Sequence, residues 1–346
     1  MCLNLSKYLM RTVAVDLGTV NTLIAVKGKG IVLREPSAAA VAAGSNREPL
    51  AFGREALQLV GRTPGGIHVV YPLRDGVVSD YNVSADMLRF FIEQALGRKV
   101  SAMGIRLVLC LPLCVTDVER RALAEAAKEA GAREVLLLDE PLASAVGAGL
   151  PVFEPTGSMA VDIGGGTTDA AVIAFGGIAA SASIRTGGTH IDGAIREHVQ
   201  KAHGLLIGER MAEEAKIRLG SALPGGAEQL EVKGRNLESG LPAGVSLTAA
   251  EVTHAMAAEI RKIVEAVKEA LAQTPPELAG DLYTNGIMLT GGGAKIRGLD
   301  KLLSHETGMP VSVGADPLDC AVLGALSMLE REESFVSVRD TLEAQG

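Results

Sequence analysis

The chain has 346 residues, enough for two domains, and its formal net charge of −8 argues against nucleic acid as the main partner. Hydrophobic residues make up 47% of the sequence and aromatic residues only 3%, so we expect cores built from alanine, valine, leucine and isoleucine. No apolar run reaches the ~18 residues of a membrane-spanning helix, which predicts a soluble or peripheral protein. The four cysteines and six histidines show no spacing typical of metal ligands, which predicts free thiols in a reducing cytoplasm.

The first eleven residues combine apolar side chains with a few polar ones. In a helix, Asn4, Lys7 and Arg11 would share one stripe with apolar side chains around the rest, as in a short helix lying in a membrane surface. Two alternatives remain open: a frayed terminus, and a translation start at Met10, directly before the first predicted strand.

Residues 14–26 predict two short strands joined by a glycine turn, and residues 160–172 repeat this pattern. A shift of 146 positions (162 − 16) aligns seven identical residues in thirteen, including Asp16 with Asp162. Glycine lets backbone N–H groups approach a phosphate, and a carboxylate at a strand end suits Mg²⁺ with its water shell. Either turn alone could be an ordinary hairpin. The repeat predicts two similar halves that face each other and hold one phosphate ligand between them.

Between the two hairpins, residues 31–80 hold several glycines and prolines and no long helical pattern, which predicts an outer region of the first half. The patterns that follow predict a helix at 84–96, a strand at 105–111, a helix at 117–130 opened by a capping box, and a strand at 134–138. Glu140 then stands at a strand end, where α/β folds carry chemistry, because Pro141 starts a new helix there. An ordinary acidic residue at a helix start is the alternative.

The second half continues after a proline-bounded crossing at 151–157. Its expected elements are a helix opened at Gly187, a helix at 208–222, alternating strands within 223–247 and a long helix opened by a capping box at Thr248. Glu213 and Lys216, spaced i and i+3, share one face of a helix, and a solvated ion pair is the simplest interpretation.

A third glycine turn follows the strand expected at 286–290, with a helical pattern at 295–303 behind it. Its glycines would let a flat ring or a phosphate approach the backbone. The last predicted helix, at 316–325, carries small residues that allow close helix contact.

These three turns resemble the phosphate-1, phosphate-2 and adenosine motifs of the actin-like ATPases, a superfamily that includes heat-shock chaperones and sugar kinases. A narrower resemblance, to the MreB family of bacterial rod-shape actins, extends in one register from about residue 13 to 325. It rests on GKGIVLREPS at 28–37, YPLRDGVV at 71–78, DVERR at 117–121, DEP at 139–141 and LIGER at 206–210.

The resemblance implies an α/β fold of the actin-like type, with two RNase H-like halves around an interdomain nucleotide cleft. The first domain would span residues 1–150 with an outer subdomain at about 31–80, and the segment 326–346 would return to it. The second would span 151–325 with an outer subdomain at about 187–250, and the helix at 316–325 would act as a hinge.

The resemblance also implies ATP and Mg²⁺ as cofactors, and ATPase activity without a Walker lysine. Asp16 and Asp162 would hold the metal, Glu140 would orient the attacking water, and Thr167 would assist it. Glu213 and Lys216 would reach the ribose and base. The residues expected to bind the nucleotide are Asp16, Gly18, Thr19, Asn21, Thr22, Gly164, Gly165, Gly166, Thr167, Thr168, Glu213, Lys216, Gly291, Gly292, Gly293 and Lys295.

As partners, the resemblance implies further copies of the chain in a head-to-tail filament, and membrane proteins of cell-wall elongation. The protein would be cytoplasmic and peripheral on the inner face of the cell membrane, bound through residues 1–11 and the loop 98–104. In this loop only Val100 and Met103 are apolar enough to enter lipid, fewer than is usual in the family. Thr189 and His190 stand where the family usually has two acidic residues, so no role is carried over to them.

Two other ATPase classes of the superfamily are the alternatives. A chaperone-type ATPase would need a further substrate domain, and we expect none after the helix at 316–325. A sugar kinase would need a base beside a sugar pocket, and the outer regions offer no candidate. The polymer-forming ATPase is therefore the prediction.

Overall fold

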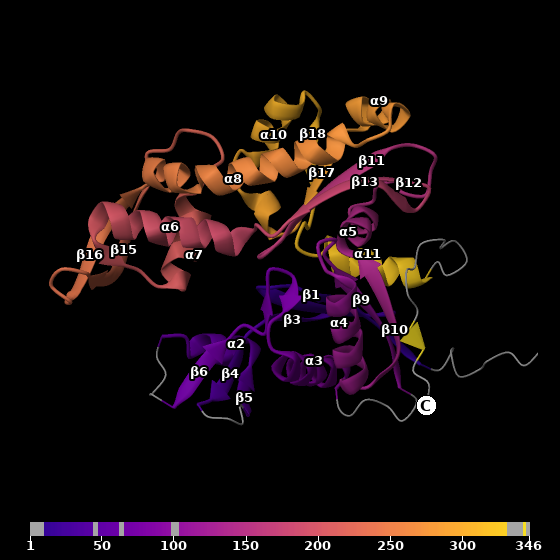
Figure 1. Ribbon diagram of the computed structural model, residues 1–346, viewed down its shortest axis with the longest axis horizontal. Helices are drawn as coiled ribbons and strands as arrows, with labels where there is room; N and C mark the ends of the chain where they lie inside the picture. The colour runs from indigo at the N-terminus through magenta and orange to yellow at the C-terminus, as the bar shows by residue number, and fades with distance from the viewer. Residues whose placement is uncertain (1–9, 44–47, 62–65, 98–103, 331–341, 344–346) are drawn as a thin grey trace, which may run out of the picture.

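The computed structural model describes residues 10–43, 48–61, 66–97, 104–330 and 342–343. In this part of the chain two large mixed sheets form two halves, with the helices α5 (Glu140–Gly147) and α11 (Cys320–Glu330) between them (Figure 1). None of the described helices combines the length and apolar character that crossing a membrane requires. The predicted membrane contacts at residues 1–9 and 98–103 lie outside the described residues.

The first half is built on a six-stranded sheet in the order β19-β10-β9-β1-β2-β3. Its strands are β1 (Arg11–Leu17), β2 (Asn21–Val26), β3 (Gly30–Pro36), β9 (Ile105–Leu111), β10 (Ala132–Asp139) and β19 (Leu342–Glu343). β1 and β2 form the predicted antiparallel hairpin, whereas β1, β9 and β10 run parallel. At the far edge, β19 pairs with β10 and brings the end of the chain back to this sheet.

Helices α3 (Tyr81–Leu96) and α4 (Asp117–Glu129) cover one face of this sheet with an apolar core. α3 begins three residues before the predicted start, because the Asp80 side chain accepts a hydrogen bond from the backbone N–H of Val83 at 3.3 Å. The predicted capping box of α4 is confirmed, with Thr116 and Glu119 bonded reciprocally.

The outer region of the first half is a three-stranded sheet in the order β5-β4-β6, beside a short helix. Its elements are β4 (Ala39–Ala42), β5 (Pro49–Phe52), α2 (Gly53–Gln58) and β6 (Ile67–Val70). A two-stranded hairpin of β7 (Leu73–Arg74) and β8 (Val77–Val78) leads back toward the main sheet. The region predicted at 31–80 therefore shares its first strand, β3, with the large sheet.

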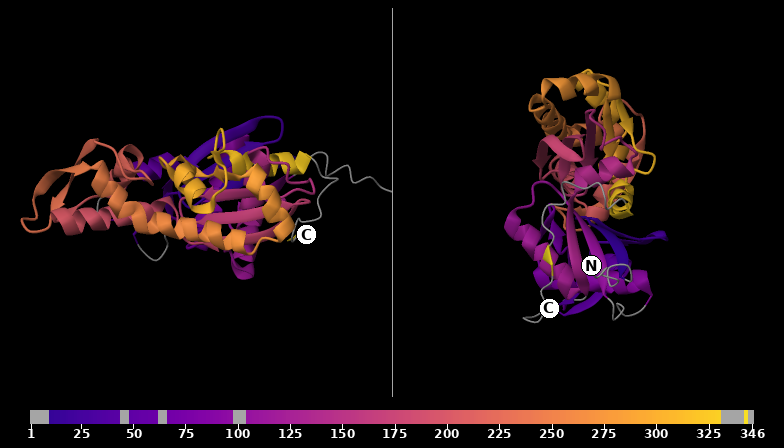
Figure 2. Two further views of the ribbon diagram at one scale, coloured as in Figure 1. Left: turned by 90° about the horizontal axis from the view of Figure 1, so that it is seen from above. Right: turned by 90° about the vertical axis from the view of Figure 1, so that its right-hand side faces the viewer.

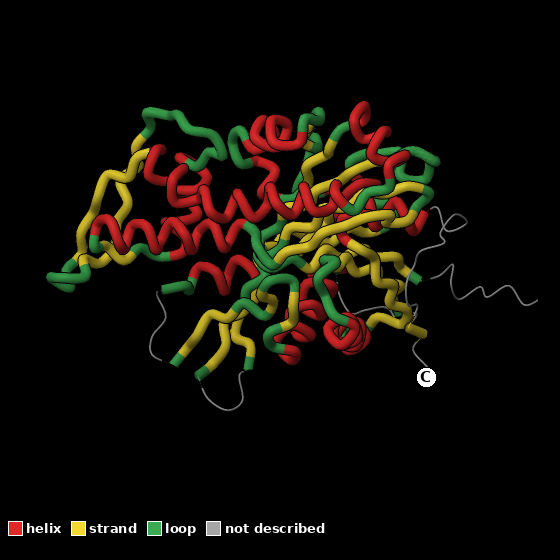
Figure 3. Tube along the Cα trace, turned by 45° about the horizontal axis from the view of Figure 1, so that its top comes forward, coloured by secondary structure: helices red, strands yellow, loops and turns green. Residues whose placement is uncertain are grey.

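The second half is built on a five-stranded sheet in the order β13-β12-β11-β17-β18. Its strands are β11 (Ser158–Ile163), β12 (Thr168–Ala174), β13 (Gly177–Ile184), β17 (Ile287–Thr290) and β18 (Val311–Val313). The long helix α8 (Ala249–Ala272) packs on this sheet and runs beside α6 (Gly188–His203), as Figure 3 shows.

The outer region of the second half is a small sheet next to α6 and α7 (Glu209–Leu219). Its strands are β14 (Leu205–Leu206), β15 (Gln229–Asn236) and β16 (Pro242–Thr248). The predicted capping box of α8, formed by Thr248 and Glu251, is confirmed.

Behind α8, the chain forms α9 (Pro276–Asn285), the 3₁₀ turn η1 (Gly292–Lys295) and α10 (Leu299–Thr307). The helix predicted at 295–303 therefore starts later, because Gly298 adopts a left-handed conformation (φ 73°) as the N-cap of α10.

The layer between the two sheets is made of small residues. Alanines of β1, β2, β11 and β12 face α5 and α11 in one shared core, and the two halves are stacked with α11 between them (Figure 2). The small-residue helix predicted at 316–325 is confirmed, but it begins at Cys320 after a turn in which Asp319 N–H donates to Asp316 O at 2.9 Å. Of the cysteines in the described residues, Cys110 and Cys320 are buried free thiols as predicted, and Cys114 is half-buried.

Candidate functional site

The two predicted hairpins have the same turn. Gly18 N–H donates to Asn21 O at 3.1 Å, and Gly164 N–H donates to Thr167 O at 2.9 Å, at positions related by the same 146-residue shift. Because side chains alternate along a strand, odd positions of β1 point into the first-half core and even positions point between the halves. Asp16 and Asp162 follow buried alanines of the inner face, so each hairpin presents its carboxylate to the other half.

The hairpins also approach each other closely at their turns. A Cβ atom on Gly165 would lie 2.4 Å from Cγ2 of Val20, so only glycine fits there. A Cβ atom on the next glycine, Gly166, would lie 2.6 Å from Oγ1 of Thr19 and 2.8 Å from Cα of Asp75. The repeat seen in the sequence therefore brings two related turns together in space.

A cavity of about 380 Å³ lies between these turns. This volume is in the usual range of ligand pockets, ~300–1,000 Å³. All but four of the predicted site residues line it: Asp16, Gly18, Thr19, Asn21, Glu140, Asp162, Gly164, Gly165, Glu213, Lys216, Gly291, Gly292, Gly293 and Lys295. The four outside the lining are Thr22, Gly166, Thr167 and Thr168.

Gly166 lies where the two hairpins meet, whereas the three threonines are buried and support the turns from behind. Thr22 is fully buried and its hydroxyl lies 2.8 Å from that of Ser37. Thr168 is also fully buried and donates to Thr186 O at 2.7 Å. Thr167 is buried, its carbonyl accepts the hydrogen bond that closes the glycine turn, and it is not among the described residues that line the cavity.

Three carboxylates meet at the floor of the cavity. Asp162, only 4% exposed, accepts hydrogen bonds on Oδ2 from Ser144 Oγ at 2.5 Å and Thr290 Oγ1 at 2.8 Å. Glu140 enters from the start of α5 at the end of β10, as predicted, and Asp16 from the end of β1.

Burial and the mutual repulsion of these groups oppose their ionisation. The pKa of Asp16 rises from 3.8 to about 7, mainly through burial and then through Asp162. Burial, Asp162 and Asp16 together raise the pKa of Glu140 well above its usual value. Burial also raises the pKa of Asp162, although its two hydroxyl donors act in the opposite direction. A divalent cation bound among these oxygens would remove the repulsion, so the carboxylates fit Mg²⁺.

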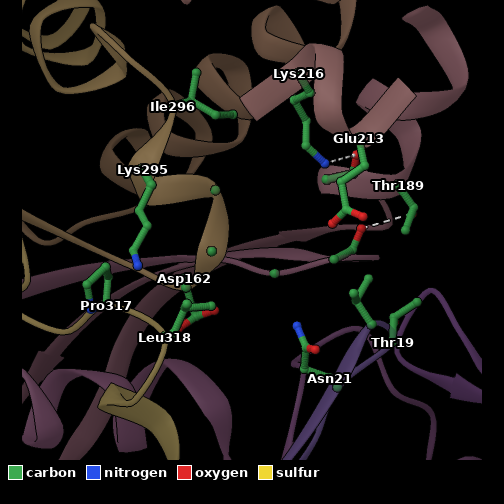
Figure 4. A pocket seen from close by; sticks show the side chains of 18 of the residues that line it. Thr19, Asn21, Asp162, Thr189, Glu213, Lys216, Lys295, Ile296, Pro317 and Leu318 are labelled. Atoms are coloured by element: carbon green, nitrogen blue, oxygen red, sulfur yellow. Dashed lines mark hydrogen bonds between the residues drawn. The ribbon is translucent and has the colours of Figure 1, made fainter. Parts of the chain in front are cut away.

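Lys216 lines the opposite wall of the cavity and is held in place by α6. Its ammonium group donates to Asp192 Oδ2 at 2.9 Å and to the carbonyl of Gly188 at 3.1 Å. The ion pair expected with Glu213 is wrong, because the partner of Lys216 is Asp192, and the exposed Glu213 extends into the cavity beside it (Figure 4). Burial raises the pKa of Asp192 to about 6, although Lys216 acts in the opposite direction.

The third glycine turn closes the cavity from the other side. Gly291 has φ 76°, and a Cβ atom there would lie 2.4 Å from Ile163 O, so the turn packs directly on the second hairpin. Lys295 extends from this turn into the cavity above Asp162 (Figure 4).

Several lining residues were missed by the sequence predictions. They include four apolar residues, which we call the apolar wall: Ile217, Ile296, Pro317 and Leu318. Ile296, Pro317 and Leu318 are labelled in Figure 4. Ile217 carried a usable signal in the sequence, because it is an apolar residue within the strongly charged segment ERMAEEAKIRL. Apolar and polar side chains that line one cavity suit a ligand with a flat ring at one end and phosphates at the other.

The mouth of the cleft is bridged by two weak polar contacts between the outer regions. His190 Nε2 lies 3.6 Å from Asp75 Oδ1, and the Tyr71 hydroxyl donates to Glu209 Oε2 at 3.2 Å. The sequence predicted no role for His190. Its Nδ1 accepts from the N–H of Gly187 at 3.2 Å, which orients the ring toward Asp75.

Comparison with known proteins gives consistent matches over nearly the whole chain. The family model described as MreB/Mbl protein matches residues 10–337. The cell shape-determining protein MreB of Escherichia coli (strain K12) is 50% identical over 321 residues, 92% of this chain and 92% of that protein. The cell shape-determining protein Mbl of Bacillus subtilis (strain 168) is 44% identical over 330 residues, 94% of this chain and 97% of that protein.

Solved structures match in the same way. MreB5 of Spiroplasma citri bound to AMPPNP has a TM-score of 0.87 and 35% identity, and the match covers 94% of this chain and 97% of that one. The MamK double helical filament has a TM-score of 0.77 at 21% identity and covers 93% and 99%, which shows similarity of fold alone.

Proposed function

Because this chain belongs to the MreB/Mbl family of cell shape-determining proteins, we propose that it binds and hydrolyses ATP and polymerises into filaments on the inner face of the cell membrane. The observation that carries this proposal is the cavity in which two repeated hairpins face each other across three carboxylates. The actin-like fold predicted from the sequence is confirmed by the structural neighbours. MreB5 of Spiroplasma citri, which is bound to AMPPNP in one structure and to ADP in another, supports a nucleotide in this cleft.

In this proposal the turns donate the backbone N–H groups of Thr19 and Gly165 to the phosphates, because those of Gly18 and Gly164 already close the turns. Lys216 and Glu213 meet the ribose and base, and the apolar wall with Ile217 packs against the ring. Asp16 and Asp162 hold Mg²⁺, which when bound neutralises charge on the phosphates.

Glu140 orients the attacking water, because it projects from a strand end into the same cavity and lies near both aspartates. The pKa of Glu140 is raised by burial and by the two aspartates. Neutralising the aspartates would therefore favour the ionised form of Glu140, which accepts a proton or a hydrogen bond from water. Thr167 supports this step indirectly, because its carbonyl sets the glycine turn.

The direct test is Mg-ATP binding and turnover by two variants of Asp162. Asp162→Asn keeps an oxygen for Ser144 and Thr290 but removes the charge, and Asp162→Ala removes both. Both are expected to weaken Mg-ATP binding and to abolish turnover, whereas Asp300→Ala on α10 is the control and should behave like the wild type. Hydrolysis at the wild-type rate in either Asp162 variant would contradict the paired-hairpin site.

Polymerisation is tested separately by electron microscopy of the purified protein with Mg-ATP, with and without anionic liposomes. Head-to-tail contacts that do not close generate filaments, so ATP-dependent linear polymers are expected. Only compact particles under all conditions would contradict the filament. The partnership with membrane proteins of cell-wall synthesis stays a prediction from the resemblance.

A further inference from the structure

Three side chains with metal-ligand atoms meet outside the cleft, where α6 and α8 run side by side (Figure 3). His198 and His203 come from the last two turns of α6, and Glu251 comes from the first turn of α8. One ligand atom of each lies within 4.8 Å of the others. This arrangement is not apparent from the sequence, because α7 and the strands of the outer sheet lie between α6 and α8 along the chain.

Glu251 is already fixed in position by the capping box of α8. Its Oε2 accepts from Thr248 N–H at 2.9 Å and from Thr248 Oγ1 at 2.6 Å. Its other oxygen, Oε1, lies 2.7 Å from Nε2 of His203. The carboxylate therefore presents Oε1, the oxygen that the helix cap does not use, to His203 and the neighbouring His198.

His198 supplies an independent indication of a ligand. Its Nε2 is buried and has no hydrogen-bond partner among the residues that the structure describes. An unsatisfied buried nitrogen is unfavourable, so such a group in a native protein calls for an explanation. A bound cation between His198, His203 and Glu251 would supply the partner that this nitrogen lacks.

The surroundings also suit a cation. The side chains of His203 and Glu251 are 24% and 28% exposed, so an ion can enter from solvent. The carbonyl end of α6, which finishes at His203 and Gly204, adds partial negative charge. On the next turn of α8, the ring of His254 lies 6.1 Å from that of His198, which places a third imidazole beside the cluster.

We propose that His198, His203 and Glu251 bind one Zn²⁺ ion, with water in the remaining position. Two imidazoles and a carboxylate with one further position form a tetrahedral ligand set typical of zinc, whereas Mg²⁺ prefers oxygen ligands alone. The ion clips the end of α6 to the start of α8. α6 begins at Gly188, which lines the cleft. By joining α6 to α8, the ion stabilises the helix that forms part of the cleft wall.

The test is titration calorimetry of the full chain with zinc chloride after chelator treatment, together with thermal unfolding with and without zinc. The wild type is expected to bind one equivalent at this site and to melt at higher temperature with zinc. His198→Ala and His203→Ala are expected to weaken zinc binding at least ~100-fold, because even the loss of an outer partner of a ligand costs 10–100-fold. Glu251→Gln provides a variant that keeps a side-chain oxygen for the capping box, and it should weaken binding while preserving the fold.

His305→Ala is the control, because this histidine lies on α10 with a side chain that is 85% exposed. It should bind zinc like the wild type. Equal zinc affinity in the wild type and all three ligand variants would overturn the proposal. Loss of zinc binding only when Cys114 or Asp162 is replaced would also overturn it, because both residues lie outside the cluster. Crystals grown with zinc provide the second measurement: an anomalous peak between His198 and Glu251 supports the site, and a peak only elsewhere overturns it.

Discussion

The contact between α5 and α11 can be tested by one added methyl group. A Cβ atom on Gly324 would lie 1.8 Å from the carbonyl oxygen of Ala143, and one on Gly147 would lie 1.9 Å from that of Cys320. Real Cβ atoms essentially never come closer than 3.0 Å to such an atom. Gly324→Ala therefore forces the two helices apart by about 1.2 Å (3.0 − 1.8) at this point.

The separation has an energetic consequence because both helices are packed into the core between the sheets. Ala143, Val322 and Ala325 are essentially unexposed there, so a displaced helix loses close contacts on both sides. Overpacking of a core typically lowers the free energy of unfolding by ~1–3 kcal/mol, and the upper value of about 3 kcal/mol is expected here. With an unfolding entropy of ~2.1 cal/mol/K per residue over 346 residues, this corresponds to a fall in melting temperature of about 4 °C.

The measurement is thermal unfolding of the nucleotide-free protein, with Gly280→Ala as the matched control. Gly280 lies within α9, and an added Cβ there meets no heavy atom within 4 Å. This control should melt about 1 °C higher than the wild type, because alanine favours a helix over glycine by ~0.8–1 kcal/mol. A melting temperature for Gly324→Ala within 1 °C of the wild type would refute the close crossing of α5 and α11.

Three further predictions concern the cleft and the membrane. Glu140→Ala is expected to keep Mg-ATP affinity and to slow hydrolysis by about 10²–10⁴-fold; an equal loss of affinity in calorimetry would contradict its role. Burial raises the pKa of Asp192 from 3.8 to about 6, so the folded state holds its proton more tightly, and the free energy of unfolding should fall by up to ~3 kcal/mol relative to Asp192→Asn as pH rises from about 3 to about 7. Denaturant titrations that give the same pH dependence for both proteins would contradict this. Removing residues 1–9 should reduce sedimentation of filaments with anionic liposomes, most clearly in low salt; full binding by a chain starting at Met10 would contradict the terminal helix.

The sequence predicted the features that depend on local pattern. The 146-residue repeat and the period-two alternation were sufficient to place Asp16 and Asp162 on facing hairpins, because a strand fixes which side its residues face. The capping boxes at Thr116 and Thr248 were equally local and are confirmed.

The features that escaped prediction depend on which segments pack together. Lys216 was paired with its helix neighbour Glu213, but Asp192 on another helix is its partner in the structure. The cluster of His198, His203 and Glu251 also joins two helices, and no spacing within one helix indicates it. Such pairs follow from tertiary packing, which a single sequence does not specify by pattern.

The base and the mouth of the cleft are held by forces of different strength. At the base, α5 and α11 are in backbone contact within a core of small side chains shared by both sheets. At the mouth, His190 with Asp75 and Tyr71 with Glu209 are exposed polar contacts, and such pairs contribute about 1 kcal/mol or less each. The Tyr71 contact is available across the physiological range, because burial and Glu209 raise the pKa of Tyr71 to about 12 and keep its hydroxyl a donor. Opening the mouth therefore costs little free energy while the base stays intact.

A ligand that touches both hairpins stabilises the closed form by its own contacts, since a ligand shifts such an equilibrium only by its difference in affinity for the two forms. In the proposed function, ATP is that ligand, and the closed cleft is the form it favours.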